Sequence, residues 1–248
     1  NFIEIEDFGN ETVFKILKKK KRNKFSYFAQ IIKLLIQIQS IKDRKVKNFK
    51  NQNYTIPKYD KKVLINEANL FCDWYVKNNF SRLRKKNFCK KFKKIVKELT
   101  LKLKLKNNIF VHRDFHVSNL MLVNNQIGLI DSQDALIGNK AYDLVSLIDD
   151  VRFKTSNSFK EKIFNFYIKK QKKLDIKKFK NDFEILSVLR NLKIIGIFTR
   201  LAHRDRKKNY LKLIPYTWQL INMRIGQNQV FIDLKNLLHQ NFKKLNEN

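Results

Sequence analysis

Apolar residues recur at helical spacing along most of the chain. Phe28, Ile31 and Leu35 are one example, because steps of three and four positions place them on one side of a helix. The same pattern predicts helices over residues 26–41, about 60–77, about 86–104, 140–151, 158–171 and about 176–203, with two more after Pro215. Asp60 is placed to cap the second of these helices, and Pro215 suits a first helical turn.

A smaller set of segments follows the pattern of strands. Residues 2–6 alternate apolar and acidic positions and predict a short strand, and residues 109–111 predict another. Residues 120–123 and 126–130 flank an Asn-Asn pair, which is typical of a tight hairpin. The pattern therefore predicts an α+β fold in which a small β region is embedded in helices, without repeats or a flexible linker.

Two polar connections complete the predicted elements. Asp7 to Asn10 predicts a turn, in which Asn10 is placed to cap the helix that follows. Residues 42–60 are polar and contain Pro57, so we expect a loop there.

The composition is that of a globular protein with a large positive charge. Hydrophobic residues make up 43% of the 248 positions, which excludes a disordered chain, but the formal net charge is +32. Lys is spread through every segment alongside Asn, Ile and Phe, which share AT-rich codons. We therefore interpret the charge as compositional background and expect no specific nucleic-acid binding. The alternative, a working basic surface, predicts strong and salt-sensitive binding to random DNA.

The remaining composition excludes several other classes of protein. Cys72 and Cys89 lie far apart in the sequence without metal-type spacing, so neither a zinc site nor a disulfide framework is expected. No segment approaches the roughly 18 consecutive apolar residues of a membrane span. No secretory leader is visible, and we expect a cytoplasmic protein that does not bind membranes.

One segment concentrates polar residues at the ends of short apolar strands. Asp114 follows the predicted strand at 109–111, whereas Asn119 and Asp131 stand at the bases of the two hairpin arms. The hairpin would bring Asn119 and Asp131 together, and two oxygen ligands suit Mg²⁺. A carboxylate beside them can accept a proton from a substrate hydroxyl. This is the arrangement that phosphoryl transfer requires; by spacing alone, loop-capping Asp and Asn residues are an equal alternative.

The order of these motifs resembles a known superfamily. His112-Arg-Asp-Phe-His-x-x-Asn119 resembles the catalytic loop of the aminoglycoside phosphotransferase and choline kinase superfamily, whose members are related to protein kinases. The blocks Gly128–Gly138, Ala141–Leu147 and Arg190–Leu201 resemble its bacterial branch of anomeric N-acetylmuramate and N-acetylglucosamine kinases. The resemblance implies a protein-kinase-like fold, mainly the helical C-terminal lobe with a small β-hairpin catalytic region.

The resemblance also implies roles for individual residues in an ATP- and Mg²⁺-dependent sugar kinase. Asp114 would be the catalytic base, and Asn119 and Asp131 would hold Mg²⁺. His112 and Asp143 would support the catalytic loop by hydrogen bonds, although Asp143 could equally be an acid that interacts with a helix dipole. Gln133, Asp134 and Arg204 are candidates for contact with the substrate. For Gln133 and Asp134, capping of the loop is an equal alternative.

Four cations in and just after the long helix predicted at 176–203 recur at helical spacing. Arg190, Lys193, Arg200 and Arg204 follow one another at intervals of three, seven and four positions. They could meet an anionic substrate. A solvated face in a Lys-rich protein is the alternative that the composition favours.

The N-terminal residues resemble the hinge of this fold. Residues 1–10 would be the hinge strand after an N-terminal lobe, with Glu4, Ile5 and Glu6 bordering the adenine, and residues 11–248 would form the C-terminal lobe. Because no lobe precedes Asn1 in this sequence, we expect weak ATP binding by this chain alone. Equal ATP affinity in a version extended upstream would contradict that expectation. An aminoglycoside, choline or homoserine kinase, or an inactive truncated lobe that binds a partner, are the alternatives; no oligomeric state is indicated.

Overall fold

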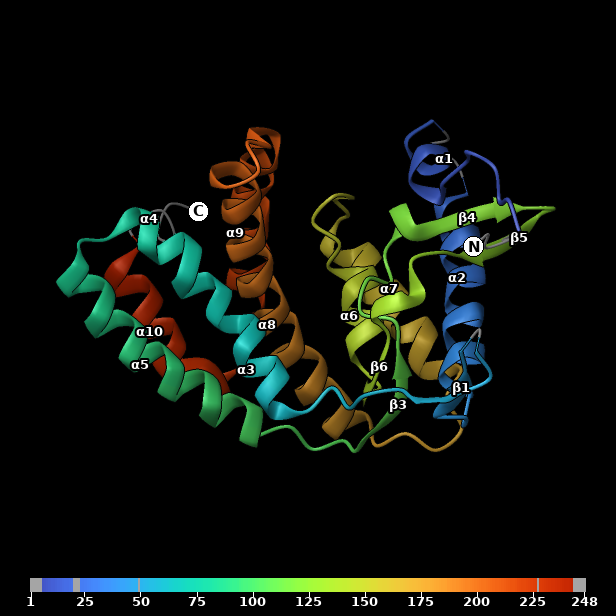
Figure 1. The fold of residues 1–248 in the computed structure, drawn as a ribbon, viewed down its shortest axis with the longest axis horizontal. Coiled ribbons are helices and arrows are strands. Elements are labelled where there is room, and N and C mark those ends of the chain that lie inside the picture. The colour runs from blue at the N-terminus through green and yellow to red at the C-terminus, as the bar shows by residue number, and fades with distance from the viewer. Residues whose placement is uncertain (1–5, 20–22, 49, 227, 243–248) are drawn as a thin grey trace. The chain divides into compact units, whose positions relative to one another are not determined.

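The computed structural model describes residues 6–19, 23–48, 50–226 and 228–242 of the chain. The chain divides into two compact units (Figure 1). Unit 1 contains residues 1–58 and 106–174, and unit 2 contains residues 59–105 and 175–248. Within the described residues, no helix is both long enough and apolar enough to cross a bilayer.

Unit 1 combines helices with three short antiparallel strand pairs, β1–β2, β3–β6 and β4–β5. Its elements are α1 (Val13–Lys19), α2 (Lys24–Gln39), β1 (Lys45–Lys47), β2 (Asn53–Thr55), β3 (Asn107–Val111), η2 (Val117–Asn119), β4 (Leu120–Val123), β5 (Gln126–Leu129), η3 (Ser132–Asp134), β6 (Leu136–Asn139), α6 (Tyr142–Ile148) and α7 (Asn157–Lys169).

The hairpin predicted around the Asn-Asn pair is present as β4–β5. Leu120 pairs with Leu129 at its open end. Asn124 and Asn125 both have positive φ, 48° and 61°, as a two-residue hairpin turn requires. Gly128 in β5 accommodates the ring of Phe8, because a Cβ on this glycine would lie 2.8 Å from a ring carbon. The segment around the predicted N-terminal turn is thereby packed on the hairpin.

Two strand pairings in unit 1 were not predicted. Strand β3 starts at Asn107 rather than at residue 109 and pairs with β6, which the sequence pattern did not indicate. The prediction that residues 42–60 form only a loop was wrong, because they contain the β1–β2 hairpin. Its strands are exposed on both faces and so lack an apolar alternation. The Asn48 side chain closes the turn by accepting the backbone N–H groups of Lys50 and Gln52.

The N-terminal turn and the start of α1 were predicted in part. The Asp7 carboxylate accepts the N–H of Gly9 at 2.7 Å, and Gly9 has a φ of 70°, which confirms the turn. Helix α1 begins at Val13, and the side chain that caps it belongs to Thr12 rather than to Asn10. The Thr12 hydroxyl accepts the N–H of Lys15 at 3.2 Å.

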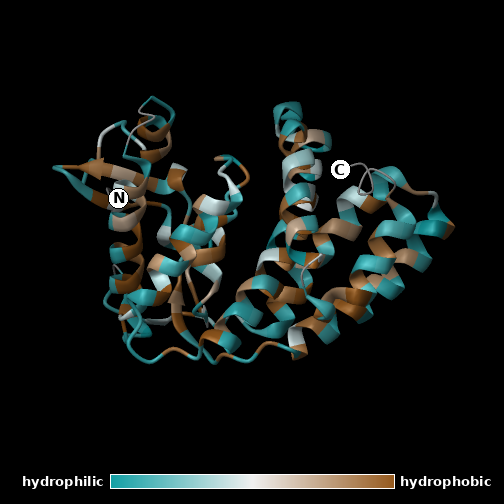
Figure 2. Cartoon of the chain, turned by 180° about the vertical axis from the view of Figure 1, so that it is seen from behind, coloured by the Kyte–Doolittle hydropathy of each residue, from teal (hydrophilic) through white to brown (hydrophobic). Residues whose placement is uncertain are grey.

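Within the described residues, the regular elements of unit 2 are all helices. Its elements are α3 (Lys61–Leu70), η1 (Phe71–Val76), α4 (Lys77–Asn79), α5 (Arg82–Leu101), α8 (Ile176–His203), η4 (Lys208–Leu213), α9 (Ile214–Ile225), η5 (Gln229–Phe231) and α10 (Ile232–Asn241). The predicted cap is confirmed, since the Asp60 carboxylate accepts the N–H of Val63 at 2.9 Å. Pro215 lies in the first turn of α9, as expected. The helices alternate hydrophobic and hydrophilic residues along their turns (Figure 2).

The core of unit 2 is built around one fully buried aromatic ring, that of Phe71. Its centroid lies between 5.3 and 6.2 Å from those of Tyr75, Phe92, Trp218, Phe242 and Phe88. The pairs with Trp218 and Phe242 are edge-to-face, a geometry that aromatic quadrupoles favour. The cluster joins residues of η1, α5 and α9 into one core.

At Gly196, helix α8 lies directly against the backbone of Leu70 at the end of α3. A Cβ on this glycine would lie 2.4 Å from the carbonyl carbon and oxygen of Leu70. Backbone atoms cannot move aside as a flexible side chain can, so only glycine fits at this crossing.

We expect Gly196→Ala to lower the free energy of unfolding by about 3 kcal/mol because the methyl group forces the two helices apart. Urea denaturation measures this change. Gly226→Ala is the matched control, since its Cβ would meet no atom closer than 3.2 Å. The control should change stability by less than about 1 kcal/mol. Equal effects of the two substitutions would contradict the interpretation.

Candidate active site

The loop that follows β3 is held by a buried carboxylate at the start of α6. Asp143 is 1% exposed, and its two carboxylate oxygens accept the backbone N–H groups of His112 at 2.7 Å and Arg113 at 3.0 Å. The Ser146 hydroxyl, one helical turn further along α6, donates to the Arg113 carbonyl at 3.2 Å. The hydrogen bonds expected of Asp143 are therefore present. They fix the direction in which the chain leaves β3, just before Asp114.

Asn119 connects this loop to the hairpin. Its side-chain amide nitrogen donates to the backbone carbonyl of Asp114 at 3.1 Å. The backbone carbonyl of Asn119 accepts the N–H of Ile130 at 3.1 Å. Within the described residues, no group donates to the side-chain oxygen of Asn119, which remains available to a ligand. Because the side-chain nitrogen of Asn119 is used in this hydrogen bond, its side-chain oxygen is the atom that can bind a metal ion.

Asp131 follows Ile130 directly and adopts an unusual backbone conformation. Its φ of 63° lies in the left-handed region, which is unfavourable for a residue with a Cβ. Arg113 shares this feature with a φ of 75°. Two such residues beside one loop are typical of functional sites, where the surrounding structure holds a strained conformation in place. Asp114 and Asp131 are both exposed, so their carboxylates are accessible to ligands.

His112 joins the loop to the strand end that carries Asp131. Its buried ring lies 3.0 Å, through Nε2, from the carbonyl oxygen of Ile130. Because a carbonyl can only accept, the proton of this hydrogen bond is on Nε2. Burial lowers the pKa of His112 below its ordinary value, although the Ile130 hydrogen bond and the charges of Asp114 and Asp131 act in the opposite direction. The ring is therefore a neutral, structural link near pH 7.

These contacts bring Asp114, Asn119 and the segment before Asp131 into one small region of unit 1. No group of three or more His, Cys, Asp or Glu side chains in the described part of the chain could hold a metal ion. A Mg²⁺ site formed by one carboxylate and one amide oxygen has a different composition, because Mg²⁺ keeps several water or phosphate ligands. The oxygen atoms of Asn119 and Asp131 fit that requirement.

The other predicted site residues lie in three places. Gln133 and Asp134 are exposed in η3, and the Asp134 backbone carbonyl accepts a hydrogen bond from the Arg113 guanidinium at 3.1 Å. Arg204 belongs to unit 2 and is paired with Asp205 at 2.6 Å. Glu4 and Ile5 lie outside the described residues, as does most of the predicted strand at residues 2–6. Glu6 is exposed and is not part of a strand.

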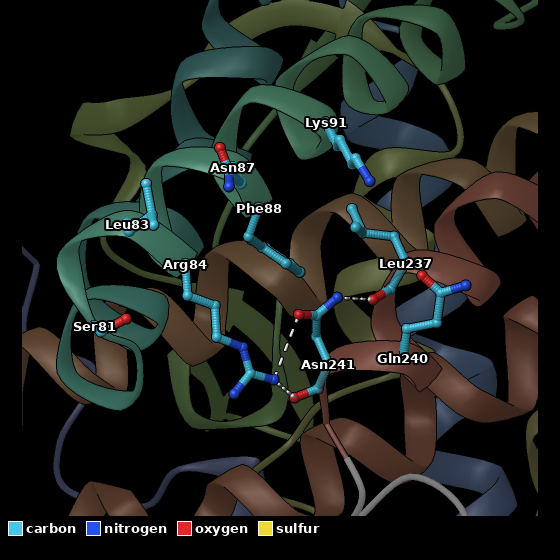
Figure 3. A pocket seen from close by; sticks show the side chains of 9 residues that line it. All are labelled: Ser81, Leu83, Arg84, Asn87, Phe88, Lys91, Leu237, Gln240 and Asn241. Carbon is cyan, nitrogen blue, oxygen red and sulfur yellow. Dashed lines mark hydrogen bonds between the residues drawn. The ribbon is translucent and has the colours of Figure 1, made fainter.

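A separate hollow of about 360 Å³ lies in unit 2 between α5 and α10 (Figure 3). Phe88 and Leu237 contribute its apolar surface, whereas Arg84 crosses it to donate to the backbone carbonyl of Asn241 at 3.1 Å. None of the residues predicted for catalysis lines this hollow. It is therefore a distinct surface feature, not the site built around Asp114.

A comparison of the sequence with known protein families matches the region that contains the loop after β3. Residues 16–175 match the phosphotransferase enzyme family (APH). This chain belongs to that family. The match includes every residue of unit 1 that positions Asp114, Asn119 and Asp131, and it confirms the resemblance inferred from the motifs.

Named relatives of this family member are bacterial sugar kinases. It is 30% identical over 220 residues to an N-acetylmuramate/N-acetylglucosamine kinase of Neisseria meningitidis, which covers 86% of this chain and 64% of the relative. A kinase of the same name from Pseudomonas aeruginosa is 28% identical, over 96% of this chain and 69% of the relative. The chain thus spans about two thirds of the length of these proteins, and slightly less than that for the Neisseria kinase.

A solved structure with the same fold is the AMP-bound complex of spectinomycin phosphotransferase APH(9)-Ia. It superposes with a TM-score of 0.54 at 15% identity and covers 82% of this chain and 67% of that protein. At this identity the likeness shows the fold alone. It confirms the predicted α+β, kinase-like fold of this phosphotransferase family member.

Sequence reasoning missed two groups that shape the loop of this family member. Arg113 was read only as part of a motif, yet it has strained φ and bonds to Asp134. Ser146 was not considered. Ser146 lies three residues after Asp143, and this spacing places both side chains on one face of α6. That spacing could have indicated its contact with the loop.

We expect Asp143→Ala to lower the free energy of unfolding by about 2–4 kcal/mol, because the buried N–H groups of His112 and Arg113 would lose their acceptors. Thermal or urea denaturation measures this loss. Asp134→Ala removes an exposed carboxylate from the same region and should change stability by less than about 0.5 kcal/mol. A tolerated Asp143→Ala would show that the loop does not depend on this carboxylate.

Proposed function

We propose that this protein is an ATP-dependent kinase that phosphorylates a hydroxyl of an amino sugar, of the N-acetylmuramate and N-acetylglucosamine type. The observation that carries the proposal is the convergence of Asp114, Asn119 and the strand end before Asp131. Membership of the phosphotransferase family supports the reaction class. The names of the relatives support the class of acceptor.

Asp114 is the proposed catalytic base. Its exposed carboxylate leaves a loop whose backbone is fixed by Asp143, so its position does not depend on a mobile segment. In the proposed reaction the acceptor hydroxyl gives its proton to Asp114 as its oxygen bonds to the γ-phosphorus of ATP. The bond between this phosphorus and the bridging oxygen breaks, and ADP leaves.

Asn119 and Asp131 are the proposed ligands of Mg²⁺. The Asn119 oxygen is available because its amide nitrogen is engaged by the Asp114 carbonyl. Asp131 follows the end of β5 with a left-handed backbone conformation, and its side chain is exposed. When bound, Mg²⁺ neutralises charge on the phosphates of the nucleotide.

A transfer assay with radiolabelled ATP tests the proposal against its alternatives. The acceptors are N-acetylmuramate, N-acetylglucosamine, an aminoglycoside, choline and homoserine. The assay is run on this chain and on a version that includes any coding sequence upstream of Asn1. We expect labelling of the amino sugars. Transfer only to another acceptor would reassign the substrate, and no transfer by either version would favour an inactive binding module.

We expect Asp114→Asn to reduce kcat by about 100-fold or more, because the amide cannot accept the hydroxyl proton. Circular dichroism and urea denaturation should show an unchanged fold, since Asp114 is exposed. Asp233→Asn removes an exposed carboxylate of α10 and is the control, which should keep its kcat within about threefold. Retained activity in Asp114→Asn would exclude Asp114 as the base.

We expect Asp131→Asn to raise the Mg²⁺ concentration needed for half-maximal activity by about tenfold or more, because one anionic ligand is replaced by a neutral amide. Titration of the initial rate with Mg²⁺ at saturating ATP measures this change. Ser132→Ala alters the adjacent exposed residue and should leave the titration unchanged. An identical Mg²⁺ requirement in Asp131→Asn would exclude this residue as a ligand.

A further inference from the structure

A groove made of two adjoining hollows lies within unit 2, between α5 and α10. The first hollow, of about 360 Å³, is the one in Figure 3. A second, of about 340 Å³, lies further along the same two helices. The two hollows share Lys91, Leu237 and Gln240, so they form one continuous groove. No residue proposed for phosphoryl transfer lines either of them, and the proposed kinase reaction leaves the groove without a role.

The first hollow combines an apolar floor with positive charge. Arg84, Phe88 and Lys91 follow one another on α5 at intervals of four and three positions, which places them on one face of the helix. In Figure 3 the ring of Phe88 lies between the two cations. Leu237 completes the floor, and Leu83 at the edge is 70% exposed. No Asp or Glu lines this hollow, so its charge is not neutralised there.

Arg84 differs from the solvated cations that a Lys-rich composition scatters over a surface. Its guanidinium carbon lies 4.1 Å from the centroid of the Phe80 ring, a cation–π distance. Its Nη2 donates to the backbone carbonyl of Asn241 at 3.1 Å. The Phe80 ring is itself held by Phe242 and Phe88, with centroids 5.1 and 5.6 Å away. Composition explains the charge of Arg84, but it does not explain why the side chain is fixed at the rim of a hollow.

The polar groups around the first hollow keep donors for a ligand. Within the described residues, Arg84 uses only Nη2 in hydrogen bonds, so Nε and Nη1 are left over. Lys91 and Gln240 make no hydrogen bond or ion pair to the described part of the chain. A cation that the fold already holds in place loses little conformational freedom when a ligand binds. The hollow is therefore organised for an anion before any anion arrives.

We propose that the first hollow binds a small organic anion, with the carboxylate of the ligand on Arg84 and its apolar body over Phe88 and Leu237. A hydrogen bond between a guanidinium and a carboxylate is strengthened by charge, and burial of the apolar body adds to the affinity. The volume is that of a small-molecule pocket. The second hollow is excluded from the site because Glu98 and Asp233 line it and would repel an anion.

Titration calorimetry with three probe compounds tests the two halves of this ligand. Octanoate carries both a carboxylate and an apolar chain, octanamide has the same chain without the charge, and acetate has the charge without the chain. We expect octanoate to bind with a Kd of about 1 mM or lower. Octanamide should bind about tenfold or more weakly, and acetate should give no measurable binding.

Variants of α5 locate the site. Arg84→Gln should weaken octanoate binding about tenfold or more, because a charged donor is lost. Arg84→Lys keeps the charge but loses the planar group that packs on Phe80, and it should have an intermediate effect. Lys90→Gln is the matched control. It removes one exposed cation from the same helix, lines neither hollow, and should leave the Kd within about twofold. Circular dichroism checks that each variant is folded.

Four results would overturn the proposal. Absence of octanoate binding to the wild type would show that the hollow is only a surface feature. Equal binding of octanoate and octanamide would show that the charge has no part. Equal weakening by Arg84→Gln and Lys90→Gln would assign binding to the general charge of α5. Competitive displacement of octanoate by ATP or N-acetylglucosamine would place the anion in the transfer site instead.

Discussion

The candidate site depends on one buried interaction, the carboxylate of Asp143 with the backbone amides of His112 and Arg113. A loop that leaves a strand exposes N–H groups that the strand no longer satisfies, and buried donors without acceptors are costly. The carboxylate satisfies two of them from the first turn of α6. Both amides point toward the Asp143 carboxylate, in a loop where Arg113 has a φ of 75° and Asp114 is exposed.

The same principle links the loop to the β4–β5 hairpin. Asn119 and His112 both bond to the backbone of Ile130, one through its N–H and the other through its carbonyl. The position of Asp131 therefore follows from main-chain hydrogen bonds made by its neighbour, whereas its own carboxylate stays exposed. The exposed carboxylate stays accessible because Asn119, His112 and the backbone of Ile130 make the hydrogen bonds that hold the segment in place.

Unit 2 is stabilised by a closely packed helical core. Its core is saturated with interactions: aromatic rings surround Phe71, and Gly196 lets α8 touch the backbone of α3. Within the described residues, α8 is buried from Asp182 to Ala202 except at Lys193, Ile197, Arg200 and Leu201.

The sequence by itself determined the features that depend on local physics. Periodicity defined α8 at 176–203, Asp60 marked the start of α3, and the Asn-Asn pair placed the β4–β5 turn, because helix spacing, capping and positive φ are properties of neighbouring residues. Tertiary structure alone decided the β3–β6 pairing, the bond of Ser146 to the loop, and the burial of Arg190 within α8. These involve partners distant in sequence, whose identity depends on how the whole chain packs and not on any local pattern.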